Sequence, residues 1–99
     1  MDQRIHISYL GLVRNVIGCS EETVNAAPGT TIGELLQLLV AKHGDPFQHS
    51  VLKNGGQLRA TAQVCLNDRD ITELQGFATQ LGSGEQVSIV VGVYPPEGG

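Results

Sequence analysis

Apolar and polar residues alternate near the start of the chain, as they do in a β-strand that buries one face. The first alternating stretch covers residues 4–11, where Ile5, Ile7 and Tyr9 are the apolar positions. A second, shorter stretch covers residues 22–26 and ends just before a Pro-Gly turn signal. The pattern therefore predicts two strands in this part of the sequence.

The period of the apolar residues changes after this turn, from two to between three and four. Thr31 and Glu34 have the spacing of a capping box, in which each side chain satisfies a backbone N–H group at the start of a helix. Gly44 and Pro46 end the predicted helix after about three turns. The apolar residues between them form one helical stripe, which has to cover a sheet: Ile32, Leu35, Leu36, Leu39 and Val40.

The second half of the chain predicts a hairpin and a final strand. Residues 45–61 have a weak pattern that indicates at most a short turn and a loop. Residues 62–66 alternate up to an Asn-Asp turn, and residues 70–71 return as a short partner strand. Residues 85–93 are apolar enough for a central strand. The order of elements predicts an α+β domain, a small mixed sheet with one main amphipathic helix across one face.

Length, composition and charge narrow the class of protein. The chain has 99 residues, 40 % apolar and 16 % charged, which fits one folded domain over residues 1–99. Ten acidic and six basic residues give a net charge of −4 without a Lys/Arg cluster, so nucleic acid is not an expected partner. There is no apolar run of about 18 residues and no signal-peptide pattern, so we expect no membrane span and a cytoplasmic location.

The titratable residues form no catalytic or metal-binding pattern. His6, His43 and His49 are not spaced as helical metal ligands, and we expect no metal site. Cys19 and Cys65 are too few for a four-thiolate site and suit a reducing compartment as small structural residues. A Cys65 nucleophile with a distant histidine base stays open, although nothing in the sequence marks it. The body of the chain is therefore interpreted as a scaffold with no bound cofactor.

The last residues carry the most specific signal. Pro95 and Pro96 lack N–H donors and cannot continue a sheet, so we expect residues 92–99 to form an extended, flexible tail. Gly98 and Gly99 then put a carboxylate on backbone without Cβ atoms, which can enter a narrow channel. The alternative is an idle, frayed terminus, because Gly and Pro also accumulate in disordered ends.

Taken together, these features resemble the ubiquitin-like sulfur carriers of the MoaD/ThiS type, most closely the small subunit of molybdopterin synthase. The resemblance implies a ubiquitin-like β-grasp fold with the first and last strands parallel and central. Five segments carry it, from the first strand and its Arg-containing loop to the Gly-Gly tail: residues 7–18 (ISYLGLVRNVIG), 29–36 (GTTIGELL), 64–71 (VCLNDRDI), 81–91 (LGSGEQVSIVV) and 95–99 (PPEGG).

The resemblance also implies a mechanism in which other proteins perform the catalysis. A separate E1-like adenylating enzyme would use ATP to activate the Gly99 carboxylate, and a sulfur donor protein would convert it to a thiocarboxylate. Pro95, Pro96, Glu97 and Gly98 would enter the active site of that enzyme and of a synthase large subunit. This chain would be a sulfur-donating subunit or co-substrate and would hold no metal.

Three functions stay open at this point. The first is a sulfur carrier in molybdopterin synthesis, and the second is a sulfur carrier for another acceptor (a thiamine thiazole, an amino acid or tRNA) or a protein modifier. The third is a β-grasp interaction module with an idle tail. Leu10 and Val90 are apolar residues in phase with the polar positions of their strands, so they are candidates for a partner surface. The alternative is that loops cover both residues as a minor core.

Overall fold

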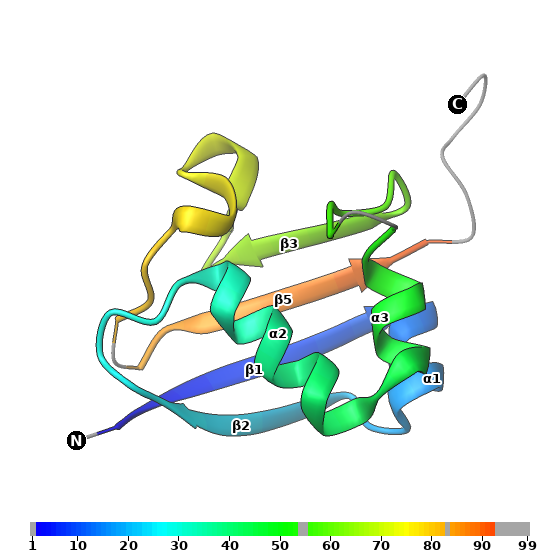
Figure 1. Cartoon of the computed structure of the whole chain (residues 1–99), viewed down its shortest axis with the longest axis horizontal. Coiled ribbons are helices and arrows are strands. Elements are labelled where there is room, and N and C mark those ends of the chain that lie inside the picture. Colours follow the sequence, from blue (N-terminus) through cyan, green and yellow to red (C-terminus); the bar gives the residue numbers. More distant parts are fainter. Residues whose placement is uncertain (1, 54–55, 83, 93–99) are drawn as a thin grey trace.

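Five strands form one mixed sheet in the order β2-β1-β5-β3-β4, and helices cover one of its faces (Figure 1). The computed structural model describes residues 2–53, 56–82 and 84–92. In chain order the elements are β1 (Gln3–Gly11), α1 (Leu12–Ile17), β2 (Glu21–Ala26), α2 (Ile32–His43), α3 (Asp45–Val51), β3 (Ala62–Leu66), β4 (Arg69–Asp70), the 3₁₀ turns η1 (Ile71–Glu73) and η2 (Gly76–Ala78), and β5 (Gln86–Val91).

The first and last strands pair in parallel at the middle of the sheet. In this register Ile7 lies beside Val87 and Tyr9 beside Ile89. The remaining pairs, β1 with β2, β5 with β3 and β3 with β4, are antiparallel. This arrangement confirms the β-grasp fold that the sequence resemblance implies.

The main helix, α2, begins at the predicted capping box. The Thr31 hydroxyl accepts a hydrogen bond from the Glu34 N–H at 3.2 Å, and the Glu34 carboxylate accepts one from the Thr31 N–H at 3.0 Å. The buried side chains of α2 face the sheet and form the core with the alternate residues of β1, β3 and β5. None of the helices in the described part of the chain is long and apolar enough to cross a membrane.

Several elements differ from the prediction. The helices α1 and α3 were not predicted, because segments of six and seven residues are too short to establish a helical period. The partner strand β4 ends at Asp70 because the Asp70 carboxylate accepts the Thr72 N–H at 2.9 Å and starts η1 at Ile71. The last strand covers residues 86–91 rather than 85–93, and Val93 lies outside the described residues.

Candidate functional site

The described chain ends at Gly92, directly after the central strand β5. The Gly92 N–H donates a hydrogen bond of 2.9 Å to the carbonyl of Thr61, so the end of β5 is tied to the segment before β3. The predicted tail residues Pro95, Pro96, Glu97, Gly98 and Gly99 lie outside the described residues. The structure therefore defines the root of the tail, Val91 and Gly92, and the surfaces around it.

On the other side of β5, the root contacts the end of β1. Gly11 is the register partner of Val91 and also the residue that precedes α1. It has φ 75° and ψ −144°, a conformation that residues with a Cβ seldom adopt. A glycine is therefore required where β1 ends and the chain turns into α1.

The two candidate surface residues are neighbours on the face of the sheet that the helices leave open. Leu10 and Val90 are register partners in the parallel pair of β1 and β5. The Leu10 side chain is 46 % exposed and Val90 is partly buried, so loops do not cover the pair as a minor core. The preceding register pair on the same face, two residues earlier in each strand, is polar and consists of Ser8 and Ser88. The apolar pair thus lies at the end of the sheet from which the tail departs.

Helix α1 adds two exposed apolar residues that the sequence analysis did not select. Leu12 and Val16 are 41 % and 42 % exposed and are four residues apart, so they lie on one side of the helix. Helix α1 contacts β5 and α3 at the same end of the sheet as the root (Figure 1). The spacing of Leu12 and Val16 was the available signal, but without a recognised helix it could not be interpreted.

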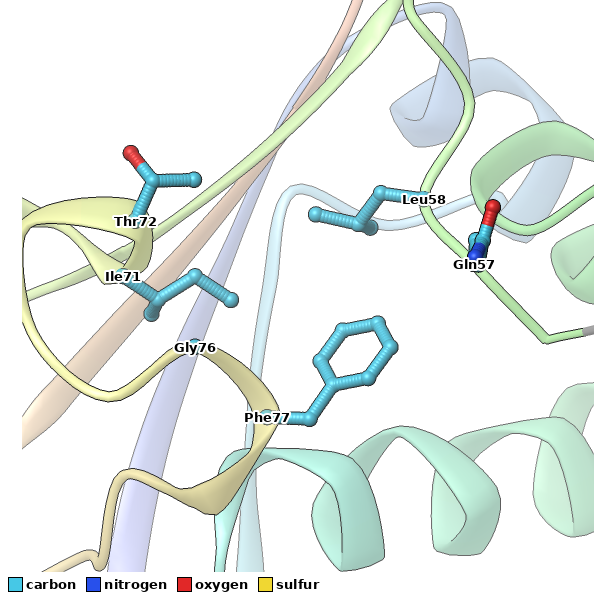
Figure 2. A pocket seen from close by; sticks show the side chains of 6 residues that line it. All are labelled: Gln57, Leu58, Ile71, Thr72, Gly76 and Phe77. Atoms are coloured by element: carbon cyan, nitrogen blue, oxygen red, sulfur yellow. The ribbon is translucent and has the colours of Figure 1, made fainter.

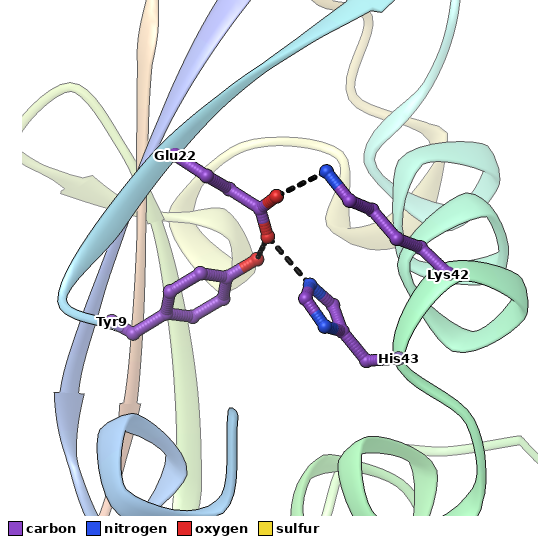
Figure 3. A network of polar contacts seen from close by, with 4 residues as sticks. All are labelled: Tyr9, Glu22, Lys42 and His43. Carbon is purple, nitrogen blue, oxygen red and sulfur yellow. Dashed lines mark hydrogen bonds and ion pairs between the residues drawn. The ribbon is translucent and has the colours of Figure 1, made fainter. Parts of the chain in front are cut away.

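A polar network joins the sheet to the end of α2 (Figure 3). The Glu22 carboxylate on β2 accepts a hydrogen bond from the Tyr9 hydroxyl on β1. It also pairs with Lys42 Nζ at 2.5 Å and with His43 Nε2 at 2.6 Å. Because a carboxylate only accepts, the His43 Nε2 carries the proton in this bond.

The network changes the ionisation of its members in opposite directions. Burial by itself would raise the pKa of the Glu22 carboxyl, but hydrogen bonds from Lys42, Tyr9 and His43 outweigh it and lower the pKa to about 2. The pKa of the Tyr9 phenol is raised well above its ordinary value by burial and by its bond to Glu22. Both groups therefore stay fixed in one protonation state near neutral pH. This behaviour is typical of a structural network and unsuited to proton transfer.

The other titratable residues that the structure describes lie at separate places in the fold. His6 lies on the open face, where it bonds Glu21 at 2.8 Å. Cys19 and Cys65 are both free thiols. Burial raises the pKa of the Cys65 thiol, and Asp70, Asp68 and Glu73 raise it further, which disfavours the thiolate that a nucleophile needs. Within the described ranges no three His, Cys, Asp or Glu side chains gather closely enough to hold a metal ion.

An open, apolar hollow of about 220 Å³ lies beside the start of α2 (Figure 2). Leu58, Ile71 and Phe77 point into it, as Figure 2 shows, and the other residues that line it are Gln57, Thr72 and Gly76. None of the six has a side chain that titrates near neutral pH. The hollow therefore carries no acid, base or nucleophile.

Comparisons with known proteins agree with this architecture. The sequence profile of the ThiS family matches residues 7–95. The chain is 26 % identical over 95 residues to small archaeal modifier protein 3 of Haloferax volcanii, a match that covers 96 % of this chain and 97 % of that protein.

Two solved structures of similar proteins have the same fold. The crystal structure of small archaeal modifier protein 1 of Haloferax volcanii superposes with a TM-score of 0.79 at 18 % identity, covering 92 % of this chain and 99 % of that one. The putative molybdopterin converting factor subunit 1 of Pyrococcus furiosus superposes with a TM-score of 0.74 at 20 % identity, again covering 92 % and 99 %. Because the family profile spans nearly the whole sequence and the fold agrees, the chain belongs to the ThiS family of ubiquitin-like sulfur carriers and protein modifiers.

Proposed function

We propose that this protein is a sulfur carrier whose Gly99 carboxylate is the reacting group. The observation that carries the proposal is the sequence Pro-Pro-Glu-Gly-Gly, which begins three residues after Gly92 at the tied end of β5. The described residues support it by contrast, because the Glu22 network is fixed in one protonation state and the pKa of the Cys65 thiol is raised. A scaffold of this kind suits a protein that presents a group to the active sites of other proteins.

The chemistry follows from the poor reactivity of a carboxylate, whose leaving group in acyl transfer would be oxide. A carboxylate oxygen of Gly99 attacks the α-phosphorus of ATP, pyrophosphate leaves, and an acyl adenylate forms. Hydrosulfide supplied by a sulfur donor protein then attacks the acyl carbon, and AMP leaves with one of the original carboxylate oxygens. Sulfur thereby takes the place of one carboxylate oxygen, and the product is a thiocarboxylate. We assign ATP binding and both steps to a separate adenylating enzyme, with this chain as its co-substrate.

The partner surface that we propose is the apolar pair of Leu10 and Val90, extended by Leu12 and Val16 on α1. Exposed apolar residues that gather in one place are typical of contact sites. Their position at the root means that a partner bound there would receive the tail directly. Residues 93–99 can span about 23 Å when extended at ~3.3 Å per residue, enough to reach into a buried active site. The adenylating enzyme and the sulfur acceptor would use this surface in turn.

The first pathway that we propose is molybdopterin synthesis. In it this chain would be the small subunit of molybdopterin synthase, which transfers the sulfur to a small molecule. The likeness to the putative converting factor of Pyrococcus furiosus supports this assignment at the level of fold. The second candidate is conjugation of the tail to other proteins. It is favoured by the 26 % identity to small archaeal modifier protein 3, which extends over almost the whole of both chains. Adenylation of Gly99 is common to both candidates.

The test is ATP–pyrophosphate exchange with the cognate adenylating enzyme. The full-length protein should support exchange, and a variant that lacks Gly99 should not. Deletion retracts the carboxylate by about 3.5 Å, and a misplacement of about 1 Å can already cost about 100-fold in rate. Normal exchange with the deleted variant would contradict the proposal, because it would show that another group is activated.

A further inference from the structure

The peptide unit between Val91 and Gly92 is held from both sides. Its N–H donates to the Thr61 carbonyl at 2.9 Å, on the side of β3. On the side of β1, its carbonyl faces Gly11, the register partner of Val91. A peptide unit is planar, so its C=O and N–H groups can only turn together. This unit is the last peptide of the described chain and lies directly before the predicted tail.

Gly11 approaches this peptide more closely than any other residue type could. A Cβ added at Gly11 would overlap the Val91 carbonyl oxygen and lie 3.1 Å from the carbonyl carbon. The positive φ of Gly11 is the reason, since it turns the Cβ direction away from the faces of the sheet and towards the neighbouring strand. Neither atom is the end of a flexible side chain, so the overlap could be relieved only by moving backbone.

We propose that Gly11 is a positioning residue for the tail. Without a Cβ it allows the Val91–Gly92 peptide to keep the orientation in which Thr61 holds it, and this orientation sets the direction in which the chain leaves the sheet. The inference rests on the proposed function, in which a partner binds the body beside the root and takes in the tail. Because the next residue is joined directly to Gly92, a turn of this peptide unit changes the direction in which a bound partner receives the chain.

Gly44 provides a matched control. It has φ 85° and ψ −164°, close to the conformation of Gly11, and it also stands between two elements, α2 and α3. A Cβ at Gly44 would meet only Pro46 Cδ, at an ordinary contact distance of 3.8 Å. Gly11→Ala and Gly44→Ala therefore impose similar backbone strain, but only the former disturbs the root.

The experiment compares both variants with the unmodified protein in ATP–pyrophosphate exchange, below the unfolding temperature of all three. We expect kcat to fall about tenfold or more for Gly11→Ala, and by a larger factor than KM rises, because the overlap lies with the Val91 backbone while the side chains of the docking surface are unchanged. Gly44→Ala should retain normal kcat. Hydrogen exchange of the Gly92 amide in the free protein should accelerate only in Gly11→Ala, as a loss of stability alone would accelerate it in both.

Equal kinetics of ATP–pyrophosphate exchange for the two variants would overturn the inference while leaving the proposed function intact. If the unmodified protein itself supports no ATP–pyrophosphate exchange, the proposed function fails. Hydrogen exchange of the Gly92 amide then still tests whether Gly11 keeps the Val91–Gly92 peptide in place. Should Gly11→Ala not fold, a synthetic protein with an ester in place of the Val91–Gly92 amide removes the N–H that the Thr61 carbonyl accepts and leaves Gly11 unchanged. The same loss of kcat is expected, and a normal kcat in the ester protein would equally overturn the inference.

Discussion

The Tyr9 hydroxyl on β1 donates a hydrogen bond to the Glu22 carboxylate on β2, on the side of the sheet that α2 covers (Figure 3). Glu22 is thereby fixed at a position where Lys42 and His43, from the last turn of α2, also reach it. One carboxylate with a side chain only 13 % exposed thus ties both strands to the helix. The network thereby stabilises the packing of α2 on the sheet.

Removing the charge of Glu22 should destabilise the fold. We expect Glu22→Gln to lower the free energy of unfolding by about 1–3 kcal/mol, because charged hydrogen bonds in a partly buried site are lost. Glu21→Gln is the control, since the Glu21 side chain is 60 % exposed and forms an exposed ion pair with His6, and it should stay within about 0.5 kcal/mol. Urea unfolding of the three proteins measures both values. Equal stabilities for the two variants would contradict the structural role of Glu22.

The same network predicts how stability depends on pH. The folded pKa of Glu22 is about 2, below its ordinary value of 4.5, so its ionisation stabilises the fold fully above about pH 4.5. This contribution is lost as the pH falls towards 2. The unmodified protein should therefore lose most of its advantage in unfolding free energy over Glu22→Gln across this range. An advantage that stays constant from pH 5 to pH 2 would show that Glu22 is not the group responsible.

A charge in the apolar pair should weaken partner binding without unfolding the domain. We expect Leu10→Glu to reduce affinity for the adenylating enzyme about tenfold or more, as at the centre of other interfaces, and Val90→Glu to act in the same direction. Leu38→Glu is the control, because Leu38 on α2 is similarly exposed at 37 % but lies on the helix-covered side of the molecule. Titration calorimetry and thermal unfolding would be measured together. Loss of folding in Leu10→Glu would mean that this residue belongs to the core.

Sequence patterns predicted the elements that depend on local order. Strand β1 and helix α2 came from the alternation of Ile5 and Ile7 and from the capping box at Thr31. Helix α1 was missed, because six residues give no period. The Glu22 network could not be predicted either, since its partners on α2 lie about twenty residues further along the chain. Such contacts depend on how the elements pack and leave no mark in a local pattern.

The root of the tail shows the same limit. Gly11 was recognised only as the end of a strand, and its approach to Val91 depends on the parallel pairing of two strands that are far apart in the sequence. For the tail, in contrast, the sequence was more informative than the structure. Its composition suggested the reacting group, although its role depends on partners rather than on contacts within the chain.

The glycines of the tail should matter for activity and not for stability. Deletion of Gly99 should change the free energy of unfolding by less than about 0.5 kcal/mol, as for surface changes away from special features. Gly98→Ala should behave alike in unfolding but strongly reduce adenylate formation, because one Cβ would obstruct a channel shaped for bare backbone. Chemical unfolding and pyrophosphate exchange measure the two effects. A Gly98→Ala protein with normal exchange would argue against a narrow channel.

The central claim is that Gly99 carries sulfur, and intact-mass spectrometry tests it most directly. The protein would be co-produced with its cognate adenylating enzyme and sulfur donor, and the deletion of Gly99 would serve as the control. We predict a species heavier by the difference between one sulfur and one oxygen atom, which an alkylating reagent modifies at the C-terminus and which the control lacks. If every molecule of the full-length protein ends in an ordinary carboxylate under these conditions, the sulfur-carrier function is contradicted.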